Sequence, residues 1–225
     1  MITNSSQSTE TPPAARRRRR GSDIVASELL DAALHEFAAH GFEGATTRAI
    51  AERAGAHQPQ INYHFESKEQ LWHAAIDRLF ALLQASIDTG ETADPVERFT
   101  VAVRQFISFS AARPELHRIM DLESTASSAR LDWIVERHAG PMFAFVSEGW
   151  AEVRAVGAGN ELAPIDVWLL LVGVGALPFA NAPVLQRFGG PDPADTEQVQ
   201  AHAAWVLTLL GLGDSASSPP RRRTT

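Results

Sequence analysis

Hydrophobic side chains recur every three to four positions through most of this chain, which is the period of an amphipathic α-helix. Near the N-terminus Leu29, Leu30 and Ala33 form such a stripe, in a helix that Ser22 would cap and Gly41 would end. No segment alternates apolar and polar residues as a strand does. The pattern predicts an all-α fold of about nine helices.

The segment that begins at Thr46, TTRAIAERAGAHQPQINYHFESKEQL, predicts a helix-turn-helix followed by a third, capped helix. Thr46 is placed to cap the first of these helices, and Gly55 closes it. Pro59 falls in the first turn of the short second helix, where a missing N–H is harmless. Ser67 and Gln70 have the spacing of a capping box at the start of the next helix.

The ends of the chain differ in composition from its body. They are rich in Ser, Thr, Pro and Arg and cannot bury a core, so we expect them to be disordered. The predicted organisation is a disordered basic arm at residues 1–21, a helix-turn-helix domain at residues 22–68, a helical domain for ligand binding and dimerisation at residues 69–212, and a disordered tail at residues 213–225.

Several classes of protein are disfavoured. The chain has no cysteine, which excludes disulfides, thiolate zinc sites and cysteine nucleophiles. The first residues lack the apolar stretch of a secretory signal, and the longest apolar run, Val167–Ala180, is too short for a bilayer, which needs about 20 residues. His35 and His40 are poorly spaced for a metal on a helix. We expect a cytoplasmic protein with no metal, cofactor or membrane partner.

The net charge of −7 conceals a segregation of charge. Arg16–Arg20 and Arg221–Arg223 lie in the tails, and the body between Gly21 and Pro220 keeps 12 basic and 26 acidic side chains, a balance of −14. Such a body is repelled by DNA unless positive groups gather at one end. The first arginine run is either a solvated tail or an arm that adds phosphate or minor-groove contacts.

The short helix after Gly55 carries polar, planar side chains, and no acidic residue lies between Ala54 and Phe65. Gln58 can bond adenine in a bidentate way, and Gln60 and Asn62 can address neighbouring bases. The alternative is that these are ordinary surface residues on a small three-helix core.

The neighbouring positions suit the DNA backbone. Tyr63, His64 and Lys68 would lie where the backbone passes, and would position the protein without reading sequence. Thr46 and Thr47 lie at a helix N-terminus, which favours a phosphate. The full predicted DNA-facing set is Thr46, Thr47, Arg48, His57, Gln58, Pro59, Gln60, Asn62, Tyr63, His64 and Lys68.

This segment resembles the TetR family of transcriptional regulators over about residues 22–83. The matching pieces are Gly41-Phe42, Thr46-Thr47-Arg48, Ile50-Ala51, Ala54-Gly55, Tyr63-His64-Phe65 and Ser67-Lys68-Glu69-x-Leu71. The resemblance implies phosphate contacts by Thr47, Tyr63, His64 and Lys68, and base contacts by Arg48, Gln58, Pro59, Gln60 and Asn62. His57 replaces a more usual Ser or Thr cap and Asn62 a commoner tyrosine, so the operator sequence cannot be inferred.

Two helices near the C-terminus, at residues 164–182 and 196–212, are expected to pair two subunits, as the family does. Small residues at Gly173 and Ala176 permit a close helix approach. An intramolecular core explains the same pattern. The candidate dimer residues are Trp168, Leu171, Val172, Gly175, Phe179, Val199, Trp205, Val206 and Leu209.

The middle helices could enclose a pocket for a small-molecule effector of unknown identity. The candidate lining residues are Phe106, Phe109, His117, Met120, Trp133, His138, Phe143 and Trp150. Each of them could equally be a core residue. His117 and His138 are the most informative, because an imidazole in an apolar cavity can orient a polar ligand group.

The sequence therefore predicts a DNA-binding transcriptional regulator that is not an enzyme. It would be a homodimeric repressor that binds a palindromic operator in double-stranded DNA and is released by a small molecule, with the helix at about residues 67–87 carrying the change. Two alternatives stay open: a helical interaction module without DNA activity, and an enzyme built on the C-terminal helical pocket, for which no nucleophile can be identified.

Overall fold

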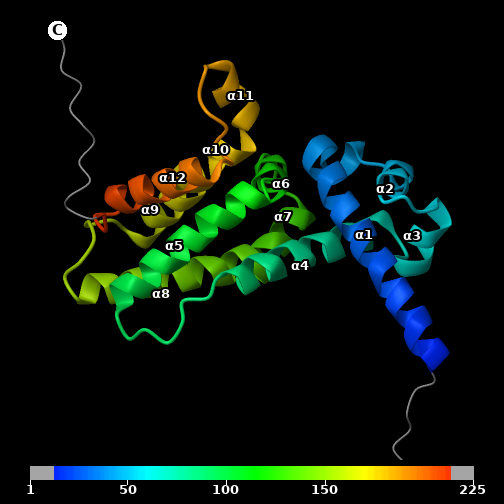
Figure 1. The fold of residues 1–225 in the computed structure, drawn as a ribbon, viewed down its shortest axis with the longest axis horizontal. Coiled ribbons are helices and arrows are strands. Elements are labelled where there is room, and N and C mark those ends of the chain that lie inside the picture. The colour runs from blue at the N-terminus through cyan, green and yellow to red at the C-terminus, as the bar shows by residue number, and fades with distance from the viewer. Residues whose placement is uncertain (1–12, 214–225) are drawn as a thin grey trace, which may run out of the picture. The chain divides into compact units, whose positions relative to one another are not determined.

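The chain is helical throughout the part that the computed structural model describes, which is residues 13–213, with side chains from residue 25 onward (Figure 1). No strand occurs in this range, so the predicted all-α fold is confirmed. The helices form ten continuous runs instead of about nine. The unpredicted run is α11 (Ala182–Arg187), a helix of six residues, none of which is buried.

The chain divides into two compact units within α4 (Lys68–Ser86), between Ile76 and Asp77. The predicted boundary after Lys68 was therefore eight residues too early. Packing explains the difference. Trp72 is fully buried in the first unit, where its indole ring meets the edge of the Phe42 ring with the two centroids 6.3 Å apart. The start of α4 thus belongs to the core of the first unit.

The first unit also contains α1 (Pro13–Gly44), α2 (Thr47–Arg53) and α3 (Gln58–His64). Residues 13–21, which were predicted to be part of a disordered arm, belong to α1. Alanine and arginine are strong helix formers, and proline is tolerated in the first helical turn. Residues 1–12 of the predicted arm and residues 214–225 of the predicted tail lie outside the described residues.

The helices of the first unit enclose a small apolar core, to which α2 is also held by an ion pair. The Arg53 Nε donates to the Glu36 carboxylate of α1 at 2.8 Å. Glu36 is buried, so this bond supplies the partner that a buried charge requires. The largest buried side chains of this core are Leu29, Leu34, Phe37, Ile50, Ile61, Leu71 and Trp72.

Two glycines set the turns of the first unit. Gly41 interrupts α1 with a φ of 66°, which confirms the predicted end of the first helix there. Gly55 follows α2 with a φ of 63°, and the next N–H, that of Ala56, donates to the Ala51 carbonyl at 2.9 Å. Only glycine adopts such a φ without steric cost, so Gly55 allows the sharp turn between α2 and α3.

The second unit is built around α5 (Pro95–Ala112), which packs against α8 and α12 (Figure 1). Its core is a single apolar cluster that includes Ile107, Trp150, Val167 and Val206. Besides α5, α11 and the end of α4, the unit contains α6 (Glu115–Glu123), α7 (Ala129–Ile134), η1 (Val135–Ala139), α8 (Gly140–Ala155), α9 (Pro164–Leu169), η2 (Leu170–Ala176), α10 (Leu177–Ala180) and α12 (Thr196–Leu209).

Two segments of the second unit, η1 and η2, are π-helical. The kink predicted at Gly140 and Pro141 takes this form, because the Gly140 N–H bonds to the carbonyl of Val135, five residues earlier. A Cβ at Gly140 would lie 2.8 Å from that carbonyl oxygen. Within residues 13–213, no helix is both long and apolar enough to cross a membrane.

We predict that Gly55→Ala lowers the free energy of unfolding by about 1 kcal/mol and that Gly55→Asn lowers it by less. A Cβ at Gly55 would meet no atom within 4 Å, so the cost arises from the positive φ alone. Asparagine adopts this conformation more easily than alanine although it is larger. Urea unfolding followed by circular dichroism measures both variants. If the cost were steric, Gly55→Asn would lower the free energy of unfolding more than Gly55→Ala.

Candidate functional site

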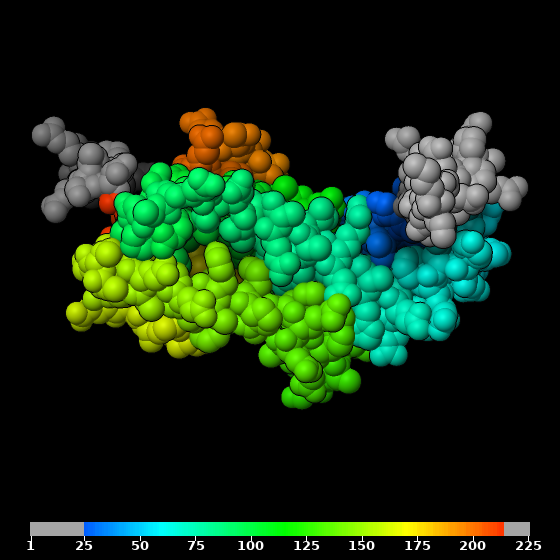
Figure 2. Space-filling model, turned by 90° about the horizontal axis from the view of Figure 1, so that it is seen from below, coloured from blue at the N-terminus to red at the C-terminus, as the bar shows by residue number. Residues whose placement is uncertain are grey.

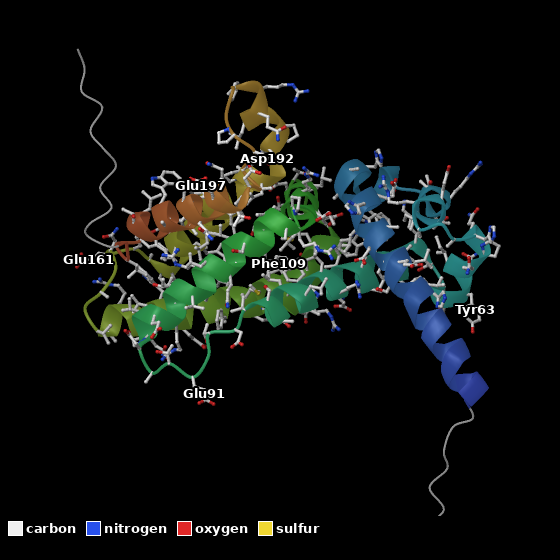
Figure 3. All side chains as sticks on the ribbon, viewed as in Figure 1. Tyr63, Glu91, Phe109, Glu161, Asp192 and Glu197 are labelled. Carbon is white, nitrogen blue, oxygen red and sulfur yellow. The ribbon has the colours of Figure 1, made fainter. Side chains whose placement is uncertain are left out.

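The outward face of α3 is an exposed polar surface. Gln58, Pro59 and Asn62 are exposed, and Tyr63 is 81% exposed and points away from the helices (Figure 3). Ile61 is buried and fixes the opposite face of the helix to the core. The predicted division between an inward and an outward face of α3 is therefore present.

Local hydrogen bonds hold α3 in place. The backbone N–H of His57, the N-cap, donates to the Gln60 Oε1 at 2.7 Å. Gln60 is half-buried, so it acts as a cap and is less available for a base than Gln58. The Gln58 Nε2 donates to the Thr47 Oγ1 at 3.3 Å, which connects α3 to the first turn of α2.

The start of α2 is also capped as predicted. The Thr46 Oγ1 accepts a hydrogen bond from the Ala49 N–H at 3.1 Å. This hydroxyl therefore has a structural role, and Thr47 is the half-buried residue beside it. Arg48 is exposed on the next position of the helix. The positive end of the α2 dipole, with an adjacent cation, suits an anionic ligand.

Lys68 is fixed at the start of α4. Its Nζ donates to the Glu43 carbonyl at 3.3 Å and lies 4.6 Å from the centroid of the Phe42 ring. The capping box predicted for this helix is present in part, because the Ser67 Oγ accepts from the Gln70 N–H at 3.1 Å. The support from Phe42 was not predicted, since it depends on a contact between residues far apart in the sequence.

The first unit thus collects the predicted DNA-facing residues on the N-terminus of α2, on α3 and at the start of α4. Between Arg53 and Glu66 this surface carries no acidic side chain. Exposed amide, imidazole and phenol groups lie next to an oriented ammonium group. Such a set can bond to base edges and to phosphate oxygens.

The second unit contains an apolar void between α5, α8 and the run α9–η2. Its empty space is about 440 Å³, open solvent at the mouth included. Of the eight side chains predicted to line a pocket, only Phe106 lines this void. The lining residues are Ile87, Phe99, Ala102, Val103, Phe106, Met142, Phe145, Val146, Trp168, Leu171 and Val172.

The other aromatic and apolar candidates do not line this void. Trp150 is fully buried in the core, and its Nε1 donates to the Leu162 carbonyl at 3.0 Å. Phe109 is buried as well. The Phe143 ring packs edge to face against Trp168, which lines the void. Met120 is half-buried on α6. The helical period of the sequence does not distinguish residues that line the void from residues of the core, because both kinds of position are apolar.

His117, one of the two predicted pocket histidines, lies in a buried contact with Ser110. Its Nε2 is 3.0 Å from the Ser110 Oγ, which itself donates to the Phe106 carbonyl at 2.8 Å. The imidazole therefore donates to the hydroxyl. Burial lowers the pKa of His117 to about 4, so the ring is neutral at pH 7.

His138, the second predicted pocket histidine, lies on η1 and packs against α4. Its ring stacks on Phe80 with centroids 4.4 Å apart, and Trp133 meets it edge-on. Its Nε2 lies 2.9 Å from the Asp77 Oδ1. Burial lowers the pKa of His138, and this outweighs the opposing effect of the Asp77 carboxylate.

Most candidate dimer residues belong to the unit's own core. Leu171, Phe179, Val199 and Val206 are buried in the apolar cluster of the second unit, and Gly175 is buried beside it. Their burial within one chain favours the intramolecular alternative for these five.

Four candidates for the dimer interface remain. Trp168 and Val172 line the void, and Trp205 and Leu209 are exposed on α12. Exposed apolar side chains also lie at Ile165, Leu169, Leu177 and Phe188, on α9, α10 and just after α11.

Within the described residues, no group of three or more His, Cys, Asp or Glu side chains is arranged to hold a metal ion.

The first unit matches a family model. The model described as "Bacterial regulatory proteins, tetR family" matches residues 29–75, which fall inside this unit. The chain is 28% identical over 139 residues to the HTH-type transcriptional regulator RutR of Escherichia coli K12, which covers 61% of this chain. The matched part of this chain spans 64% of the length of RutR.

A second relative is covered more fully. The chain is 31% identical over 140 residues to the HTH-type transcriptional repressor AcnR of Corynebacterium diphtheriae, covering 62% of this chain and 70% of AcnR. Its fold is similar to that of AibR, solved in complex with isovaleryl coenzyme A and operator DNA, with a TM-score of 0.66 and 18% identity over 83% of this chain and 98% of AibR.

We predict that the free energy of unfolding falls by about 2 kcal/mol between pH 7 and pH 5 through His117. Its folded pKa of about 4 is below the unfolded value of 6.5, so the unfolded state binds more protons in this interval. The stabilisation is complete above pH 6.5 and is lost as the pH falls toward 4.

Urea unfolding at several pH values measures this effect, with His117→Gln as the comparison. His138 contributes in the same direction in both proteins, so the difference between their pH profiles isolates His117. Parallel profiles for the two proteins would contradict the assignment.

Proposed function

This chain belongs to the TetR family of bacterial regulatory proteins, and we propose that it is a transcriptional repressor that binds a palindromic operator as a homodimer and is released by a small molecule. The observation that carries the proposal is the surface of α3. It is exposed, polar and free of carboxylates in a chain whose body has a large excess of acid. An acidic surface would not approach DNA.

The residues of this surface have two roles in the proposal. Gln58 and Asn62, with Arg48, read base edges in the major groove. Thr47 and Lys68 bond to phosphates and set the register, as do Tyr63 and His64. Gln60 caps α3, so its contribution to base reading is secondary to that of Gln58.

The dimer interface in this proposal is the exposed apolar face of the second unit. Ile165 and Leu169 are four residues apart on α9, and Trp205 and Leu209 are four apart on α12. Residues at this spacing share one face of a helix. A contiguous exposed apolar patch marks an interaction site, and a two-fold dimer matches a palindromic DNA site.

Effector release operates through α4. Lys68, proposed to hold a phosphate, begins this helix, and Ile87, which lines the void, directly follows its end. A ligand in the void that favours one position of the end of α4 therefore also selects among positions of its beginning. AibR, whose fold is similar, has been solved with both a ligand and operator DNA.

Two other functions have less support. A hydrolase would need a histidine that accepts a proton from its nucleophile, and His117 instead donates to Ser110. An interaction module without DNA activity would have no use for a recognition surface that excludes carboxylates.

We predict that Lys68→Gln weakens binding to every DNA sequence and reduces the salt slope by about 1.8, which is 0.9 for each subunit. Gln58→Ala should instead cost about 1–3 kcal/mol at one base pair of each half-site and leave other sequences unaffected. Sites are first selected from random DNA, and binding is then measured by fluorescence anisotropy at several salt concentrations.

Glu28→Gln, on an exposed position of α1, serves as the control and should bind like the unaltered chain. An interaction module would yield no selected site at all. Equal losses for Lys68→Gln and Gln58→Ala on every sequence would contradict the division of roles.

We predict that Leu169→Glu converts the dimer to a monomer, because it places two charges in an apolar interface. Leu169 is 60% exposed within one chain, so the change leaves the unit's own core intact. Val135→Glu, at an exposed apolar position on η1, should remain dimeric. Sedimentation velocity separates the two outcomes, and a dimeric Leu169→Glu protein would place the interface elsewhere.

A further inference from the structure

We propose that the effector is a cationic amphiphile, with an apolar body in the void and an ammonium head at the mouth between α5 and α8. This inference rests on the proposed ligand-released function and adds the chemical class of the ligand. Three features carry it: an apolar void, an aromatic opening and a carboxylate at that opening.

The void accepts only an apolar body. Each of its lining side chains is aliphatic, aromatic or a thioether, so a polar group inside it would lose its hydrogen bonds. Most of its empty space is narrow or open to solvent, and only about 40 Å³ admits the centre of a water-sized sphere, well below the about 300–1,000 Å³ of small-molecule sites. A single alkyl chain therefore enters only if the apolar walls move apart.

A second, more polar cavity at the surface adjoins the void. The two cavities share the walls formed by Phe99, Ala102 and Phe145. Figure 2 shows the surface hollowed between the teal segment that leads into α5 and the yellow-green α8. Phe145 is half exposed at this junction and also lines a third cavity, so its rotation outward would widen the entrance.

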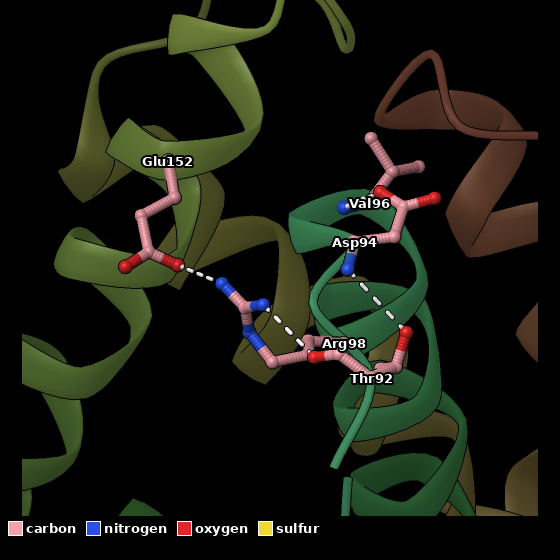
Figure 4. A network of polar contacts seen from close by, with 5 residues as sticks. All are labelled: Thr92, Asp94, Val96, Arg98 and Glu152. Carbon is pink, nitrogen blue, oxygen red and sulfur yellow. Dashed lines mark hydrogen bonds and ion pairs between the residues drawn. The ribbon is translucent and has the colours of Figure 1, made fainter. Parts of the chain in front are cut away.

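The charged residues of this mouth are Arg98, Glu148 and Glu152, which give it a net negative charge. Arg98 is already occupied (Figure 4): it donates to the Glu152 carboxylate at 2.6 Å and to the Thr92 carbonyl at 3.1 Å. No described residue forms a hydrogen bond or an ion pair with the Glu148 carboxylate. Glu148 and Glu152 are four apart on one helix and repel each other, which a bound cation would relieve.

The loop before α5 reinforces this negative potential. Asp88 and Asp94 adjoin Thr89 and Pro95, which line the mouth, and the loop has no basic residue. The Asp94 Oδ1 caps α5 by accepting from the Val96 N–H, and the Asp88 Oδ1 accepts from the Gly90 N–H. Their charges therefore stay near the mouth, which disfavours a carboxylate or phosphate head.

The aromatic walls add a second preference for a cation. The rings of Phe99 and Phe145 line both the void and the mouth. A quaternary ammonium group is attracted to aromatic faces and needs no hydrogen-bond acceptor. The mouth is negatively charged, whereas an anionic acyl coenzyme A, such as the ligand of AibR, would require a positively charged mouth.

The test is a calorimetric titration of the full chain, without DNA, with decyltrimethylammonium, decanoate and decanol below their micellar concentrations. We expect the cation to bind at least about tenfold more tightly than the carboxylate, with decanol between them. Equal binding of all three, preference for decanoate, or no binding of the cation would overturn the proposal.

Variants at Glu148 locate the head group. Glu148→Gln should weaken cation binding about two- to fivefold, and Glu148→Lys about tenfold or more, with a gain for decanoate. Glu91→Lys makes the same change of charge on a side chain that points into solvent (Figure 3), and should leave binding within about twofold. Equal effects of Glu148→Lys and Glu91→Lys would show that the mouth does not hold the head and would overturn the assignment.

Circular dichroism melting curves establish that each variant is folded before titration. Because the titration contains no DNA, it fails or succeeds independently of operator binding. A chain that binds an operator but not the cation keeps the proposed function and loses this inference. A chain that binds the cation but no DNA keeps the site and loses the repressor function.

Discussion

The burial of one helix in two separate cores is the constraint on which the rest of this structure depends. The first part of α4 is held by Trp72 and Leu71 in the first unit, and its second part is held by Leu79 and Leu83 in the second. Neither unit can complete its core without this helix. Any ligand or partner that displaces one end of α4 therefore acts on an element that the other unit also needs, and the proposed regulation uses this shared helix.

The distribution of charge determines which kind of partner each unit can bind. The body of the chain is strongly acidic, and the α3 surface carries no carboxylate between Arg53 and Glu66. The same excess of acid surrounds the mouth of the void, where Glu148 has no partner among the described residues. The proposed DNA surface of one unit and the proposed cation site of the other thus follow from one electrostatic pattern.

The sequence predicted the first unit well because its signals are local. Thr46, Ser67 and Gly55 each determine a cap or a turn within a few residues, and the structure places all three as expected. The helical domain was harder to predict, since an apolar residue at the right period can be core, cavity wall or interface. Leu171 was expected at an interface and lies in the core, next to the void. That distinction depends on which helices pack together, and one sequence does not determine it.

The contacts of Lys68 have a consequence for the entropy of association. A free lysine side chain loses about 1.5–2 kcal/mol of rotamer freedom when it is immobilised. In this chain the Glu43 carbonyl and the Phe42 ring restrict the ammonium before any partner arrives. Much of that loss therefore occurs during folding. The side chain is pre-organised, so more of the attraction between its charge and an anion remains as net affinity.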